Sequence, residues 1–94
     1  MAIADYAAGE LHRMSHALKD YALLHRGGIE IDGEVTELVE SRWTSAHGPV
    51  DQILAYLAVD KRLVILTGTS PAPIPPAIRQ QMLQMMTSFQ RARA

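Results

Sequence analysis

Cysteine is absent from this chain of 94 residues, and its acidic and basic residues nearly balance, with a formal net charge of −1. Without a thiol, the chain can form no disulfide bond and no thiolate metal site. Without an excess of basic residues, it has no global field that attracts nucleic acid or an acidic membrane surface. These absences exclude thiol redox chemistry and argue against binding that is driven by net charge.

Long apolar runs and aromatic residues are also scarce. No segment approaches the roughly 18 consecutive apolar residues that a membrane-spanning helix needs. The N-terminus has no basic region followed by an apolar stretch and a small-residue cleavage site, so no secretory signal is visible. We therefore expect a cytoplasmic protein. Aromatic residues make up 5% of the chain, so aliphatic side chains must build the core of what its length predicts to be one domain, residues 1–94.

Residues 3–26 carry the clearest pattern in the sequence. Their apolar side chains recur at steps of three and four, at Ile3, Ala7, Leu11, Met14, Leu18 and Tyr21. Residues at these steps share one face of a helix, and a mean step near 3.5 is typical of a seam between packed helices. Gly27 and Gly28 follow, and glycine readily takes the left-handed conformation that ends a helix. We predict one long helix here that needs a partner for its apolar stripe.

The next segment, residues 29–35, allows two interpretations. Apolar and acidic residues alternate around Asp32-Gly33, which is typical of a tiny β-hairpin. Alternatively, the segment is an extended link in which Asp32 caps a helix over residues 33–46. We favour the link, because an isolated hairpin this short is marginal. In that helix Trp43 would be a core anchor, with a partner hot spot as the alternative role.

Pro49 is well placed to begin a third helix. The apolar run Leu63–Leu66 is typical either of a buried strand or of the end of a buried helix, and we favour a helix that continues to Thr67. Residues 69–76 contain four prolines, which predicts a stiff connector. The prolines at its end would start a last helix with a second seam-like stripe, formed by Ile78, Met82, Met85, Met86 and Phe89.

No catalytic or cofactor motif can be assembled from the remaining polar residues. His12 and His16 share a helical face, but a zinc site needs three or four ligands and no further ligand has a matching spacing. The acidic run Glu34, Glu37 and Glu40 is typical of a solvated face. We therefore predict a protein that is not an enzyme, with no metal and no cofactor.

A DNA-binding regulator is the alternative. The predicted helices over residues 33–46 and 49–67 would form a helix-turn-helix unit. Its recognition helix would begin at Pro49 and offer only Gln52 to read a base edge, with no basic residue before Lys61. The missing basic footprint argues against this alternative.

The sequence thus predicts an all-α bundle of three or four helices, with long heptad-like first and last helices and at most a short β-pair. We expect a bacterial or phage interaction module, such as an assembly factor, a chaperone or an inhibitor-type regulator, that self-associates as a homodimer or binds a protein partner. Small molecules and membranes are not expected as partners. The expected partner-binding residues are apolar ones on the predicted helices: Leu11, Met14, Leu18, Tyr21, Trp43, Met82, Met85, Met86 and Phe89.

Overall fold

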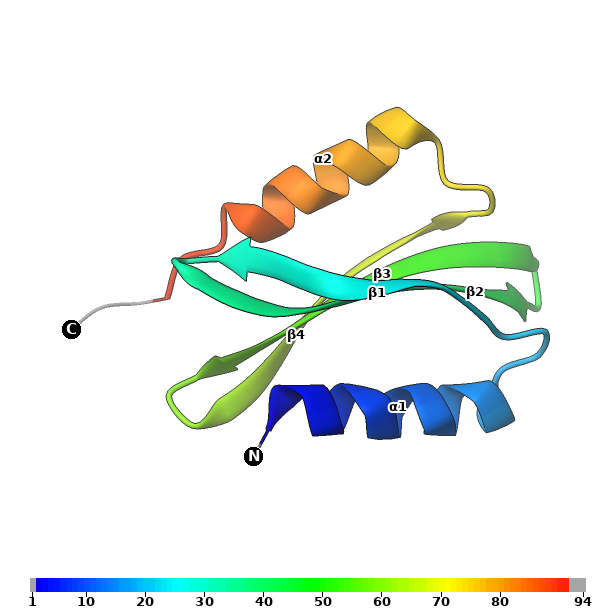
Figure 1. Cartoon of the computed structure of the whole chain (residues 1–94). Helices are drawn as coiled ribbons and strands as arrows, with labels where there is room; N and C mark the ends of the chain where they lie inside the picture. Colours follow the sequence, from blue (N-terminus) through cyan, green and yellow to red (C-terminus); the bar gives the residue numbers. More distant parts are fainter. Residues whose placement is uncertain (1, 92–94) are drawn as a thin grey trace.

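The chain folds around a four-stranded antiparallel sheet with one helix on each face, and not as an all-α bundle (Figure 1). The computed structural model describes residues 2–91. The elements in chain order are α1 (Ile3–Ala17), β1 (Ala22–Ile31), β2 (Glu34–Ser45), β3 (Gly48–Val59), β4 (Arg62–Pro71) and α2 (Pro76–Thr87).

The sheet is a simple meander in the order β1-β2-β3-β4, and each pair of neighbours is joined by a two-residue turn. In the first turn Asp32 and Gly33 both have positive φ, 52° and 82°, as a type I′ turn requires. Asp60 and Lys61 in the third turn also have positive φ, 49° and 64°. The hairpin around Asp32-Gly33 is therefore real, and the extended link that we favoured from the sequence is wrong.

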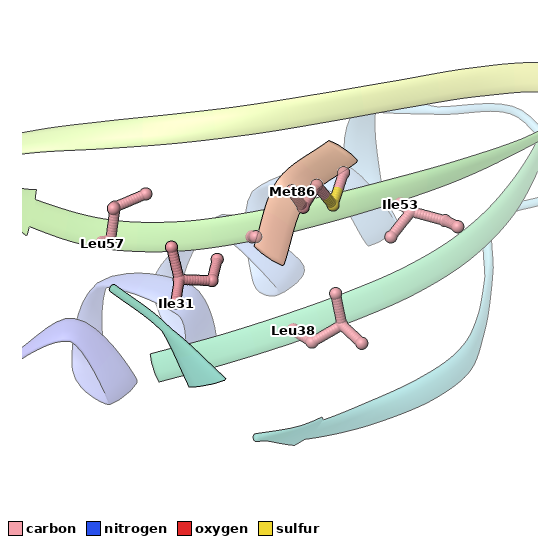
Figure 2. Close-up of a cluster of buried hydrophobic side chains, with 6 residues drawn as sticks. Ile31, Leu38, Ile53, Leu57 and Met86 are labelled. Atoms are coloured by element: carbon pink, nitrogen blue, oxygen red, sulfur yellow. The ribbon is translucent and has the colours of Figure 1, made fainter. Parts of the chain in front are cut away.

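The first of two cores lies between the sheet and α2. Figure 2 shows its buried side chains, which β1, β2, β3 and α2 contribute: Ile31, Leu38, Ile53, Leu57 and Met86. Met86 is the only fully buried residue of α2. Partly buried residues of β4 and of α2 surround this cluster.

The second core lies on the opposite face, beneath α1 (Figure 1). Ala7 of α1 packs there against Val39, Leu54 and Tyr56, all of which are buried. The rings of Tyr6 and Tyr56 lie 6.0 Å apart in a tilted arrangement. Because the two helices lie on opposite faces, the sheet separates them, and the predicted seam between the first and last helices does not form.

The two covered faces explain why the sequence was misleading. In β2, Leu38 points into the core under α2, while its neighbour Val39 points into the core under α1. The same holds in β3 for Ile53 and Leu54. A strand buried on both faces shows no clean alternation of apolar and polar residues. Its adjacent apolar pairs then resemble a helical stripe, so the helices predicted over residues 33–46 and 49–67 are strands.

The ends of the predicted helices are partly correct. The first helix begins at Ile3 as predicted but ends at Ala17, because residues 22–31 pair with β2 instead of extending it. The last helix begins at Pro76, with proline at its start as predicted. The predicted connector over residues 69–76 is shorter than expected, since Thr69 to Pro71 pair with β3.

Candidate groove between β4 and α2

Helix α2 is held on the sheet by an ion pair near its first turn. Arg79 donates from Nε and Nη2 to the two carboxylate oxygens of Glu40, both at 2.7 Å. Glu40 lies in the middle of β2 and is 8% exposed. The Arg79 guanidinium holds the pKa of this carboxyl below its usual value, against the opposing effect of burial. The pair therefore ties α2 to a central strand.

The loop before α2 is held by a second buried carboxylate. Asp51 of β3 is 3% exposed and accepts hydrogen bonds from the backbone N–H of Ile74 at 2.9 Å and from Arg42 Nε at 2.6 Å. Arg42 and then the Ile74 N–H lower the pKa of Asp51, and burial opposes them. After α2, Arg91 donates to Asp32 in the first turn at 3.1 Å. Hydrogen bonds to carboxylates of the sheet and its first turn thus hold the chain in place both before and after α2.

A glycine sets how closely α2 approaches β4. A Cβ atom built on Gly68 would lie 2.7 Å from Met82 Sδ and 3.2 Å from Met82 Cγ. Real Cβ atoms essentially never make a contact as short as 2.7 Å, so any side chain at this position would push Met82 aside. Gly68 therefore lets the methionine lie directly on the strand.

Beside this contact, the surface opens into an apolar groove of about 660 Å³, which we call the Met groove. It runs between the edge strand β4 and the C-terminal half of α2. Its lining consists of Ile65, Leu66, Thr67, Gly68, Met82, Met85, Met86, Ser88 and Phe89. Met85 is 73% exposed at its rim, while Met86 is buried at its base. No lining residue carries a charge, so the groove is suited to apolar side chains.

The structure brings together four of the residues that the sequence predicted for partner binding. Met82, Met85, Met86 and Phe89 all line the Met groove. Met86 is also part of the core under α2, where Met82 and Phe89 pack against it. The other side of the groove was missed, because residues 63–67 were assigned to a helix. The β-branched residues Val64, Ile65 and Thr67 were the signal for a strand there.

The remaining predicted residues lie apart from the groove. Leu11 and Met14 pack into the core under α1. Leu18 caps the C-terminus of that helix through a backbone hydrogen bond to Met14. The Tyr21 hydroxyl makes a 2.7 Å hydrogen bond with the Ser41 hydroxyl. These residues hold α1 and the following loop on the sheet, so the predicted set does not form one surface.

Trp43 lies on β2 and is half-buried. Its indole N–H is buried without a hydrogen-bond partner among the described residues, as is the hydroxyl of Tyr56. Burial raises the pKa of Tyr56 to about 12. Neither group lines the Met groove.

No arrangement of polar groups in the described residues suggests metal chemistry. The rings of His12 and His16 meet edge to face, with centroids 4.7 Å apart. Within residues 2–91, no three histidine, aspartate or glutamate side chains are grouped so that they could hold a metal ion. In the same part of the chain, no helix has the length and apolar character to cross a membrane.

Comparison with known proteins gives one family match and one similar solved structure. The model of the DcrB family matches residues 1–88. The crystal structure of PA94, a protein of unknown function from Pseudomonas aeruginosa, superposes with a TM-score of 0.84 at 20% sequence identity. The superposition covers 99% of this chain and 65% of that chain, so the protein described here spans about two thirds of its neighbour's length. No curated protein matches the chain.

Proposed function

The chain belongs to the DcrB family, and we propose that it is a non-catalytic protein-interaction module whose Met groove receives an apolar helical segment of another protein. The family match extends over both helices and all four strands, so the elements that form the groove lie within it. Such a module would act as an assembly factor, a chaperone or an inhibitor-type regulator. We also propose that it self-associates as a homodimer.

The observation that carries this proposal is the apolar lining of an open groove. Met85 is exposed at the rim, and Leu66, Gly68 and the half-buried Met82 line the groove with Met86 at its base. Methionine is flexible and polarizable, so it suits a surface that adapts to side chains of different shape. An amphipathic helix that lies in a groove presents apolar side chains at steps of three and four. The neutral lining matches such a face.

The helix-turn-helix unit on which the alternative of a DNA-binding regulator was based does not form. The predicted helix-turn-helix unit over residues 33–67 consists of β2, β3 and the start of β4. Pro49 and Gln52 lie on β3, so no recognition helix begins there. The cytoplasmic location stays a prediction from the sequence.

Binding of a model peptide tests the proposal. The probe is a fluorescently labelled helical peptide with leucine at positions i, i+3, i+4 and i+7, and binding is followed by anisotropy. We expect saturable binding to the protein and a loss of roughly tenfold or more in affinity for Met85→Glu, since the new carboxylate would be desolvated by the peptide.

Val35→Glu is the matched control, because Val35 is 76% exposed and Met85 is 73% exposed. Val35 lies on β2, away from the Met groove. We expect this variant to bind the peptide as the unmodified protein does. Equal binding by the two variants, or no saturable binding at all, would contradict the proposal.

A further inference from the structure

Met82 lies between the two elements that form the Met groove. It belongs to α2 and lines the groove, and its side chain also lies against β4 at Gly68. A Cβ atom at Gly68 would meet Met82 Sδ at 2.7 Å, Cγ at 3.2 Å and Cβ at 3.6 Å. The methionine is therefore seated on the strand along its length, and the missing side chain of the glycine leaves the space for that seat.

The space around Met82 is filled on the core side. Gly68 pairs with Ile53 of β3, which is 1% exposed, and Met86 on the next turn of α2 is 5% exposed. Both belong to the buried cluster against which Met82 packs (Figure 2). On its other side Met82 faces the Met groove, which has a volume of about 660 Å³. A thioether that is pushed off its seat on Gly68 therefore has room only toward the groove.

We infer that Gly68 and Met82 together determine the size of the side chain that the Met groove accepts. This inference rests on the proposed function, because it assigns the specificity of the same groove. With glycine at position 68, the thioether stays on the strand and leaves the depth of the groove to a large aliphatic side chain of the bound helix, such as leucine. With a side chain at position 68, the thioether turns into the groove and occupies the space that leucine needs.

The lining of the groove favours selection by size over selection by charge. No charged residue contributes to it. Of its two hydroxyl groups, that of Ser88 already donates to the backbone oxygen of Met85 at 2.7 Å. An apolar site discriminates by how well a side chain fills it, and one missing methylene group changes binding by roughly 10–200-fold. A shift of one thioether is therefore large enough to change which side chain binds best.

The experiment compares three versions of the labelled helical peptide. They carry alanine, leucine or phenylalanine at position i+4 and leucine at the other three positions, and anisotropy gives the dissociation constant of each. We expect the unmodified protein to bind the leucine peptide roughly tenfold or more tightly than the alanine peptide. In Gly68→Ala this preference should fall by roughly tenfold, because the displaced Met82 fills the space for leucine and leaves room for alanine.

Further variants separate the seat of Met82 from a general loss of stability. In Gly68→Ala/Met82→Ala the preference for leucine should return, because the displaced thioether is gone. Met82→Ala alone leaves β4 unchanged and enlarges the groove, so it should shift the preference from leucine toward phenylalanine. Gly9→Ala is the matched control, because it adds the same methyl group on α1, where the nearest atom is Arg13 Nη1 at an ordinary 3.6 Å. It should leave the preference unchanged.

Methyl NMR with isotope-labelled methionine follows the position of Met82 directly. The chain has five methionines, and the signal that disappears in Met82→Ala belongs to Met82. We expect Gly68→Ala to shift this signal and Gly9→Ala to leave it in place. This comparison needs no peptide, so it tests the displacement of Met82 separately from binding. Addition of the leucine peptide to the unmodified protein should also shift the Met82 signal.

The outcomes for this inference and for the proposed function differ. If none of the three peptides binds the unmodified protein, the proposed function fails and the inference fails with it. If the leucine peptide binds and Gly68→Ala weakens the alanine and leucine peptides by the same factor, only the inference is overturned. It is likewise overturned by a Met82 signal that stays in place in Gly68→Ala, by a double variant that does not recover the preference for leucine, or by an unchanged preference in Met82→Ala.

Discussion

Replacing Arg79 with methionine should destabilise the protein by leaving a buried carboxylate without its partner. Glu40 has a side chain that is 11% exposed, whereas the side chain of Arg79 is 43% exposed. A fully buried ion pair that loses one partner costs about 3–5 kcal/mol, and an exposed pair contributes about 0–1 kcal/mol. Because one partner is buried and the other is half-exposed, we expect Arg79→Met to lower the free energy of unfolding by about 2 kcal/mol.

The loss should depend on pH in a defined direction. In the unmodified protein Arg79 lowers the pKa of Glu40 in the folded state, so the pair stabilises the fold above the unfolded pKa of about 4.3. That contribution is lost as the pH falls through the lower folded pKa. In Arg79→Met the lowering effect of Arg79 is gone, and burial together with the nearby Asp51 carboxylate raises the pKa of Glu40, with His25 as a weaker opposing charge. The penalty in the variant is therefore relieved on acidification, and the difference in stability between the two proteins should shrink as the pH falls through the lowered folded pKa of Glu40 in the unmodified protein.

Urea denaturation at pH 7 and at pH 3.5 measures both effects. Arg13→Met is the matched control, because Arg13 pairs with Glu10 on the exposed surface of α1 with a side chain that is 61% exposed. We expect no measurable change in stability for this control, because exposed ion pairs contribute little. The double variant Glu40→Gln/Arg79→Met should be more stable at pH 7 than Arg79→Met alone, since it removes the unpaired charge.

Either of two results would contradict a charge-pairing role for Arg79. One is a cost for Arg79→Met that is no larger than that of Arg13→Met at pH 7. The other is a cost that stays constant between pH 7 and pH 3.5, because a purely steric role for Arg79 would not respond to the titration of Glu40.

Four further changes test other parts of the structure. Gly68→Ala should cost about 1–3 kcal/mol in urea unfolding through its clash with Met82, and adding Met82→Ala should recover part of that loss. Gly33→Ala should cost about 1–2 kcal/mol, since Gly33 has φ of 82°; an unchanged midpoint would contradict the type I′ turn. Tyr56→Phe should change the free energy of unfolding at pH 7 by less than about 1 kcal/mol, because the hydroxyl has no partner among the described residues. Ultraviolet titration of the unmodified protein should show one tyrosine that ionises near pH 12, and the variant should lack this transition, which assigns it to Tyr56. Asp51→Asn should cost about 1–3 kcal/mol at pH 7, and this cost should decrease as the pH falls through the lowered folded pKa of Asp51, where the carboxylate of the unmodified protein becomes protonated.

Local signals in the sequence determined the ends of several elements. Pro76 begins α2 because proline suits the first turn of a helix, and the stripe of Ile78, Met82 and Met85 identified that helix. The apolar stripe from Ile3 also identified α1. Asp32-Gly33 contained the signal for a type I′ turn, which requires positive φ at both positions. These features depend on a few neighbouring residues, so they can be recognised without the rest of the chain.

Only the tertiary structure decided which secondary structure the middle of the chain adopts. Leu38 and Val39 are adjacent apolar residues, and they pack against different helices on opposite faces of the sheet. Adjacent apolar residues of this kind fit a helical stripe as well as a strand that is buried on both faces. The local sequence does not show that a helix covers each face of the sheet. The Met groove has the same origin: Gly68 and Met82 are distant along the chain and meet only because α2 returns over the sheet beside β4.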